Sequence, residues 1–238
     1  MQDAIAPETG LPRRPGVGRL QARFSLALGG LAVAGLMLAF FLLGSEVLEG
    51  ETRGFDLFVL RAIQAPGPGH PWFVEAMRDL SGLGSTIVLC TLTGAGFGYL
   101  VLVSEKALAF LLASATASGA MAVGMLKTAF GRSRPDAIFA AIESHGYGFP
   151  SGHATNSAIV FLTLGAIFAS RQARPVERSC MLALAVLMAA MVGLSRVALG
   201  VHWPTDVIAG WAFGAAWALL WLLAAQWLAA RNGAFLPA

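Results

Sequence analysis

Six long apolar stretches constrain this chain more than any other feature of its sequence. They lie near residues 24–43, 84–103, 107–128, 152–170, 179–200 and 205–229. Each is long enough to cross the roughly 30 Å hydrocarbon core of a bilayer as an α-helix. Only 12% of the 238 residues are charged and 57% are hydrophobic, which is too apolar for a water-exposed globule. We therefore expect an all-α, polytopic membrane protein with six transmembrane helices.

The six stretches form one predicted domain, residues 24–230, between a polar tail at 1–23 and another at 231–238. The first stretch favours an uncleaved span over a cleaved signal peptide, because it is long and no clear cleavage site follows it. The connection at residues 44–83 contains two segments with helical apolar spacing, F-D-L-F-V-L-R-A-I and W-F-V-E-A-M-R-D-L. We expect them to lie on the membrane surface, with an ordinary folded loop as the alternative.

Basic residues predict the orientation, because they concentrate in cytoplasmic loops. With six spans, the basic N-terminal tail, Lys106, the loop at 171–178 and Arg231 share one face. Both termini should therefore be cytoplasmic and the opposite loops periplasmic, as in a multi-pass protein of a bacterial inner membrane.

Other features are assigned to packing. Cys90 and Cys180 lie in apolar stretches and are expected to be small hydrophobes, with no metal site or disulfide. The net charge of +3 gives no reason to expect nucleic acid as a partner, and the sequence does not predict an oligomeric state. Small residues that let helices approach closely are Ser114, Ser118, Gly124, Gly210 and Gly214.

Six ionisable residues fall at the outer ends of the third to sixth spans, where polarity is costly and tends to mark a site. They are Lys127, Arg134, His153, Arg196, His202 and Asp206. Three are cations with one carboxylate among them, which favours an anionic ligand such as phosphate. The set predicts a shared anion pocket on the periplasmic side.

The first turn of the fourth span adds a second anion-binding feature. Ser151 is expected to be its N-cap, and Gly152 lets an oxyanion approach the unpaired N–H groups of that helix. His202, oriented by Asp206, suits a nucleophile, and His153 suits a proton donor beside a phosphate. Arg132, Glu143 and His145 share the outer loop and are interpreted as solvated residues.

Three segments now stand in order: K-T-A-F-G-R-S-R-P, P-S-G-H and S-R-V-A-L-G-V-H-W-P-T-D. Together they resemble the three-part motif of the type 2 phosphatidic acid phosphatase family. The resemblance implies that His202 attacks phosphorus to form a phosphohistidine and that Asp206 orients it. It implies further that His153 transfers the proton, and that no metal or cofactor takes part. The phosphoryl oxygens would be held by Lys127, Arg134, Ser151, Gly152 and Arg196.

The expected function is metal-independent hydrolysis of a lipid phosphate at the surface of the bilayer. Candidate substrates are a polyprenyl pyrophosphate, phosphatidic acid, phosphatidylglycerol phosphate and a lipid A phosphate. A lipid phosphotransferase that uses the same residues remains an alternative, and an anionic-lipid transporter is a more distant one.

Overall fold

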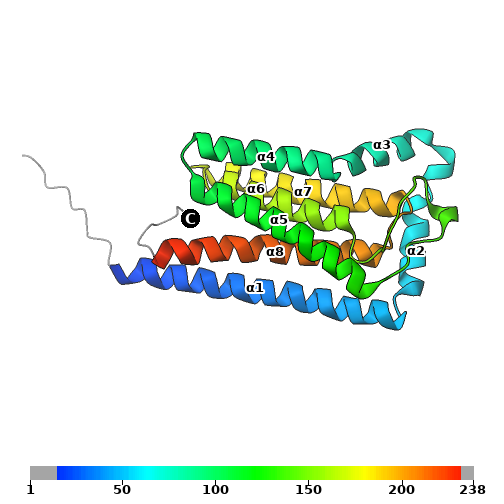
Figure 1. Cartoon of the computed structure of the whole chain (residues 1–238), viewed down its shortest axis with the longest axis horizontal. Helices are drawn as coiled ribbons and strands as arrows, with labels where there is room; N and C mark the ends of the chain where they lie inside the picture. Colours follow the sequence, from blue (N-terminus) through cyan, green and yellow to red (C-terminus); the bar gives the residue numbers. More distant parts are fainter. Residues whose placement is uncertain (1–14, 232–238) are drawn as a thin grey trace, which may run out of the picture.

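A computed structural model describes residues 15–231, and all of its regular elements within that range are helices (Figure 1). Of the predicted tails at 1–23 and 231–238, residues 1–14 and 232–238 lie outside the described residues. The six long helices are α1 (Pro15–Glu49), α4 (Thr86–Leu102), α5 (Lys106–Phe130), α6 (Gly152–Ala169), α7 (Pro175–Ala198) and α8 (Pro204–Arg231). Shorter elements connect them: α2 (Arg53–Gln64), η1 (Gly67–Gly69), α3 (Pro71–Gly82) and η2 (Ala137–Phe139).

The number of spans agrees with the sequence prediction. Among the described residues, 5 helices are long and apolar enough to cross a membrane, and the number rises to 6 if α3 and α4 together form one span bent by 43°. The described structure is therefore the predicted all-α polytopic fold.

The largest difference between a predicted span and the helix that contains it concerns α1, although the candidate span Phe24–Glu49 starts where the prediction did. The predicted span at 24–43 is part of a longer helix that begins at Pro15 and ends at Glu49. The predicted N-terminal tail at 1–23 is therefore helical over its last residues. The sequence prediction followed the apolar residues alone, but a helix continues beyond them because it needs no apolar side chains outside the bilayer.

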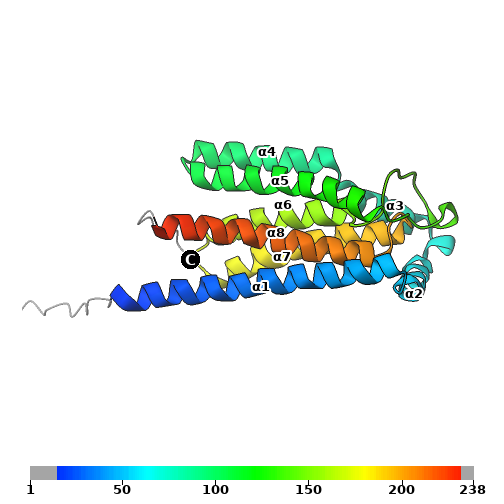
Figure 2. The same cartoon turned by 60° about the horizontal axis from the view of Figure 1, so that its bottom comes forward.

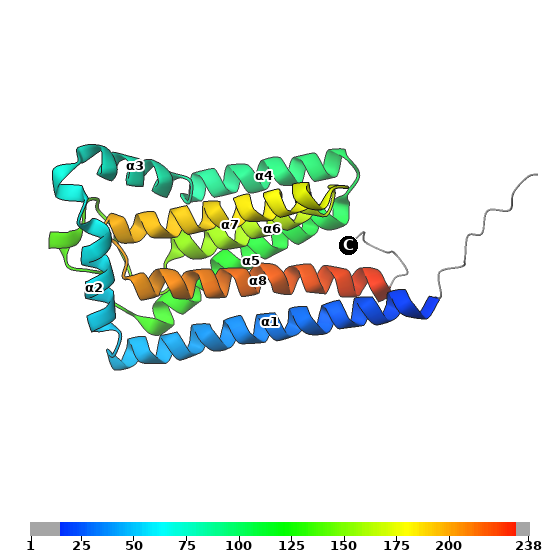
Figure 3. The same ribbon diagram turned by 180° about the vertical axis from the view of Figure 1, so that it is seen from behind.

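The connection at 44–83 contains the two helices that apolar spacing indicated. Each has a distinctly amphipathic sequence, and α2 buries Asp56 and Leu60 while Phe58 on its other face is exposed. Figure 3 shows α2 crossing one end of the bundle, roughly perpendicular to the long helices. This end is opposite the one where α1 begins and α8 ends.

Helix α6 is the centre of the bundle and packs against α4, α5, α7 and α8 (Figure 2). It is also rich in buried residues over almost its whole length. Helix α1 packs mainly on α8. Its Phe40 touches Phe213 of α8 and also stacks on Phe149, which lies just before α6. The position of α6 is important for function, because its first turn carries two of the predicted site residues.

Close packing of α8 on α6 depends on glycine. A Cβ at Gly214 would lie 2.7 Å from the backbone oxygen of Thr155, and one at Gly210 would lie 3.1 Å from that of Ser151. The packing prediction is confirmed for these two glycines. It is wrong for Gly124, where a Cβ would meet nothing within 4 Å.

Gly214 and Gly124 allow a matched pair of substitutions, one at a packed site and one at an open site. We expect Gly214→Ala to lower the free energy of unfolding by about 1–3 kcal/mol, because a methyl group there overlaps the α6 backbone. Gly124→Ala should leave stability unchanged or raise it by up to about 1 kcal/mol, since alanine favours helix. Thermal unfolding of the two variants in detergent measures the difference. Equal unfolding temperatures would contradict the packing described for α6 and α8.

Candidate active site

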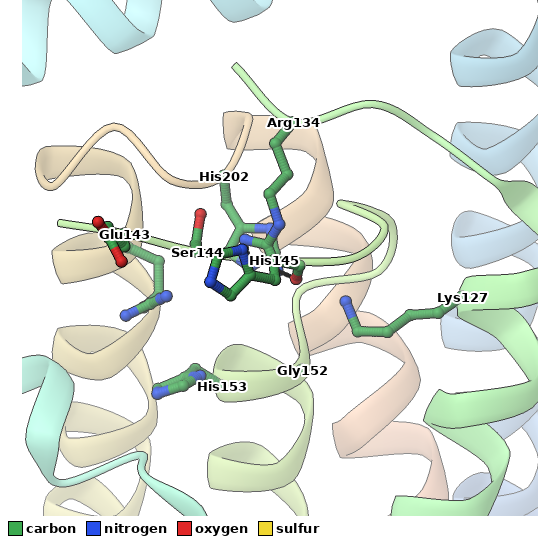
Figure 4. A pocket seen from close by; sticks show the side chains of 9 residues that line it. Lys127, Arg134, Glu143, Ser144, His145, Gly152, His153 and His202 are labelled. Atoms are coloured by element: carbon green, nitrogen blue, oxygen red, sulfur yellow. Dashed lines mark hydrogen bonds between the residues drawn. The ribbon is translucent and has the colours of Figure 1, made fainter. Parts of the chain in front are cut away.

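A cavity of about 320 Å³ opens at the end of the bundle that α2 crosses (Figure 4). Its walls come from the ends of α5, α6 and α7 and from the loops before α6 and α8. The lining residues are Lys127, Arg134, Glu143, Ser144, His145, Gly152, His153, Arg196 and His202. Side chains from separate segments therefore point into one space, as the sequence predicted for a shared pocket.

Six of the eight predicted site residues line this cavity, and the other two lie behind it. Ser151 and Asp206 are both fully buried. Asp206 lies behind the cavity wall, with its Oδ2 next to Nδ1 of His202. This is the position expected for a carboxylate that orients the imidazole. Ser151 lies next to the lining residue Gly152 but is not itself part of the wall.

Hydrogen bonds join the three motif segments directly. The Ser151 N–H donates to the backbone oxygen of Asp206 at 2.9 Å. The Gly148 N–H donates to the Arg132 oxygen at 2.7 Å, and the indole of Trp203 donates to the Ser133 oxygen at 3.1 Å. Segments far apart in the chain are thus fixed to one another by main-chain groups, which positions their side chains.

Two of the pocket cations are held by backbone carbonyl groups. The Lys127 ammonium donates to the Tyr147 oxygen at 2.7 Å. The Arg134 guanidinium donates to three carbonyl oxygens at distances of 2.8 to 3.0 Å, those of His145, Gly146 and Val201. A carbonyl group fixes a cation without cancelling its charge, so both remain available to an anion.

Arg196 is held in a similar way. It is only 6% exposed, its Nη1 donates to the hydroxyl of Ser81, and its buried Nε has no protein partner among the described residues. In the part of the chain that the structure describes, neither Arg196, Lys127 nor Arg134 forms an ion pair with a carboxylate. The pocket therefore has an excess of positive charge, which favours a multiply charged anion.

The hydrogen bonds of His202 determine its tautomer. Arg134 Nη1 lies 3.1 Å from His202 Nε2, and a guanidinium can only donate. Nε2 must therefore be the unprotonated nitrogen, and the proton sits on Nδ1, which faces Asp206 Oδ2 at 3.3 Å. The free lone pair is thus on Nε2, the ring nitrogen next to the cavity-lining Arg134.

Burial keeps this imidazole neutral. His202 precedes α8 and is 1% exposed, and its burial lowers the pKa to about 4, although hydrogen bonding and the charge of Asp206 act in the opposite direction. The positive charge of Arg134 adds to the lowering. At neutral pH the imidazole is accordingly uncharged, which is the form that can act as a nucleophile.

The first turn of α6 presents free groups to the same cavity. Ser151 occupies the N-cap position as predicted, but its side chain makes no capping hydrogen bond. Its buried hydroxyl has no partner among the described residues. The N–H groups of Gly152 and His153 therefore keep their capacity to donate, next to the positive end of the helix dipole.

Three loop residues that were interpreted as solvated either line the cavity or form ion pairs next to it. Arg132 has a side chain only 13% exposed and forms ion pairs with Asp56 and Asp206, so its assignment was wrong. Glu143 and His145 are exposed, yet both line the cavity, and Glu143 adds a carboxylate to its wall. These loop residues have no periodic pattern in the sequence, so only their nearness to the first motif segment could have indicated them.

No group of three or more His, Cys, Asp or Glu side chains that could hold a metal ion occurs within residues 15–231. Cys90 and Cys180 are unpaired among these residues and exposed on the apolar helices.

Fold and site together define a polytopic membrane protein with a cationic, histidine-containing anion pocket at one end of its bundle. Residues 107–230 match the family model of the PAP2 superfamily. This range contains all three motif segments. The chain belongs to the PAP2 superfamily.

Two curated relatives and one solved structure agree with this assignment. Phosphatidylglycerophosphatase B of Bacillus subtilis is 31% identical over 188 residues, which cover 75% of this chain and 87% of the relative. Lipid A 1-phosphatase of Rhizobium johnstonii is 37% identical over 121 residues, but these cover only 47% of this chain and 45% of that protein. A crystal structure of a transmembrane PAP2-type phosphatidylglycerolphosphate phosphatase from Bacillus subtilis superposes with a TM-score of 0.73 at 25% identity. That superposition covers 80% of this chain and 94% of the other.

The neutrality of His202 can be measured directly. The chain has 4 histidines, so ¹³C-labelled imidazoles give few signals, and His202→Gln assigns the one of interest. We expect the His202 signal to keep its neutral position down to pH 5 and to move only near pH 4, because burial lowers its pKa. A midpoint at or above 6.5 would contradict the protonation state described here.

Proposed function

We propose that this protein is a membrane-bound phosphatase that hydrolyses a lipid phosphate through a phosphohistidine on His202. The observation that carries the proposal is a neutral imidazole whose Nε2 faces a cavity with three cations that lack carboxylate partners. Membership of the PAP2 superfamily and the phosphatase names of both relatives support its assignment as a hydrolase.

In the first step, the Nε2 lone pair of His202 attacks phosphorus while the bond from phosphorus to the leaving oxygen breaks. His153 gives its proton to that oxygen, so the leaving group departs as a protonated species, either an alcohol or a phosphate with one more proton. Asp206 accepts the Nδ1–H bond and stabilises the positive charge that develops on the ring.

In the second step, water attacks the phosphohistidine. His153, now neutral, takes a proton from the water, the P–N bond breaks, and its electron pair returns to Nε2. Inorganic phosphate leaves and the original protonation states are restored.

The cations of the pocket serve the transition state. Arg134, Lys127 and Arg196 surround the position of the equatorial phosphoryl oxygens, and the N–H of Gly152 adds a main-chain donor. Ser151 is proposed to act from behind this turn through its unpartnered hydroxyl. The cations that share the pocket with His153 disfavour a further positive charge on its ring. We therefore propose that His153 takes up its proton when a phosphate dianion is bound.

The position of the cavity supports a lipid substrate. It lies at the end of an apolar bundle, where an acyl or prenyl chain could remain in the bilayer while the phosphate enters the pocket. The two curated relatives are named for different phosphate-bearing lipids, so we propose the class of lipid phosphomonoesters and pyrophosphates without choosing within it.

The orientation is also a proposal. The loops between α4 and α5 and between α6 and α7, with Lys106, Arg171 and Arg174, lie at the bundle end opposite the cavity. By the positive-inside rule that end is cytoplasmic, and the cavity opens to the periplasm of a bacterial inner membrane.

A panel of lipid phosphates tests the proposal. Purified protein in mixed micelles should release phosphate from at least one phospholipid or prenyl pyrophosphate, and the rate should persist in EDTA. Vanadate, which mimics the transferring phosphoryl group, should inhibit it. His202→Ala should lower kcat by at least about a thousandfold, and Asp206→Asn by about a hundredfold or more.

Two outcomes would contradict this proposal. Full activity in His202→Ala would remove the phosphohistidine, and loss of activity in EDTA with recovery on adding a divalent metal would show a different mechanism. Product analysis with and without an acceptor lipid separates hydrolysis from phosphotransfer, because only transfer consumes the acceptor.

A further inference from the structure

A second buried carboxylate lies next to the candidate site and outside the three motif segments. Asp56 on α2 is fully buried. Its Oδ2 accepts from Arg132 Nη2 at 2.6 Å, and its Oδ1 accepts from the backbone N–H of Thr205 at 3.0 Å. The Thr205 hydroxyl donates to the same carboxylate at 2.8 to 2.9 Å. The buried charge of Asp56 depends on these partners, because an unpaired buried carboxylate would cost several kcal/mol.

Arg132 connects this carboxylate to the catalytic pair. Its Nη1 donates to Asp206 Oδ1 and its Nη2 donates to Asp56 Oδ2. A planar guanidinium thus lies between two buried carboxylates and fixes their separation, which a lysine could not do with a single nitrogen. Thr52 Oγ1 accepts a further bond from Nη2 at 3.1 Å.

The contacts of Asp206 show what the bridge controls. One oxygen, Oδ1, faces Arg132. The other, Oδ2, accepts from the Trp203 N–H at 3.0 Å and faces His202 Nδ1 at 3.3 Å. The guanidinium therefore determines which oxygen of Asp206 is presented to the histidine, and at what angle.

Charge gives the second part of the argument. Arg132 alone would neutralise Asp206 and weaken its attraction for the His202 ring. Because Asp56 shares the same guanidinium, the three groups together keep one negative charge, and Asp206 can still stabilise a positive His202 in the transition state.

Asp56 also fixes the start of α8. The Thr205 N–H belongs to the first turn of α8, and the carboxylate from α2 accepts it as an N-cap side chain would. The next residue along the chain is Asp206. The same carboxylate thus positions Asp206 twice, through the backbone of α8 and through Arg132.

We propose that Asp56 and Arg132 are positioning residues for the His202–Asp206 pair, so that helix α2, which crosses the end of the bundle, is part of the catalytic apparatus. This inference rests on the proposed phosphatase function. It assigns to Arg132 and Asp56 a role that acts through Asp206, with no contact to substrate.

Kinetics of Asp56→Asn test the proposal. We expect kcat to fall by about 10- to 100-fold, while KM changes by less than about threefold, because the substrate pocket itself is not altered. The matched control is Asp136→Asn, which removes an exposed carboxylate that pairs with Arg53 at 3.9 Å on the same side of the molecule. That variant should keep kcat within about twofold.

A double-mutant cycle shows whether Asp56 acts through Asp206. Adding Asp56→Asn to Asp206→Asn should lower kcat by less than about twofold, because the group on which Asp56 acts is already lost. An undiminished effect in the double variant would overturn the proposal.

A binding measurement separates this inference from the proposed function. Vanadate can take a histidine nitrogen as its fifth ligand, whereas inorganic phosphate binds through charge alone. Calorimetry on Asp56→Asn should show about tenfold weaker binding of vanadate and phosphate binding within about twofold of the unsubstituted protein. Equal losses for both anions would overturn the positioning role, even if no lipid phosphate is hydrolysed.

Arg132 supplies a second variant in case Asp56→Asn does not fold. Arg132→Lys keeps the charge but loses the fork, so it should show the same selective loss of vanadate binding. Vanadate binding and kcat in Arg132→Lys equal to those of the unsubstituted protein would contradict the bridge.

Discussion

The rest of the site depends on positive charge that is fixed in place without being neutralised. Lys127 and Arg134 donate to backbone carbonyls, and Arg196 donates to a serine hydroxyl. Carboxylate partners would hold these side chains equally well but would cancel the field that an anion needs. The accepting carbonyls belong to the loops before α6 and α8, so the conformation of those loops determines where the charge is placed.

Those loops are themselves fixed by the packing of the long helices. Gly210 and Gly214 bring α8 close to α6, and the Ser151 N–H then reaches the backbone oxygen of Asp206. Because both helices begin at this level, the first turn of α6 and the residues before α8 face each other across the cavity. Apolar packing within the bundle thus sets the spacing between His153 and His202 at its end.

The sequence predicted the spans and most of the cavity wall, because both follow from composition and from polar residues at unusual positions. It did not predict the roles of Arg132 and Asp56, which lie 76 positions apart in the chain and meet only in the folded structure. Glu143 and His145 were missed for a related reason. Their loop has no periodicity, and its course is determined by bonds to Arg134.

The contact between Arg134 and His202 bears directly on the proposed chemistry. The guanidinium lies 3.1 Å from Nε2, on the side of the ring from which the proposed attack on phosphorus would start. A bound phosphate would offer Arg134 a stronger, charged acceptor than a neutral imidazole, so we expect the guanidinium to turn from His202 to the substrate. In the proposed mechanism this movement would expose Nε2 and take a positive charge away from the ring, just as the ring begins to carry one itself.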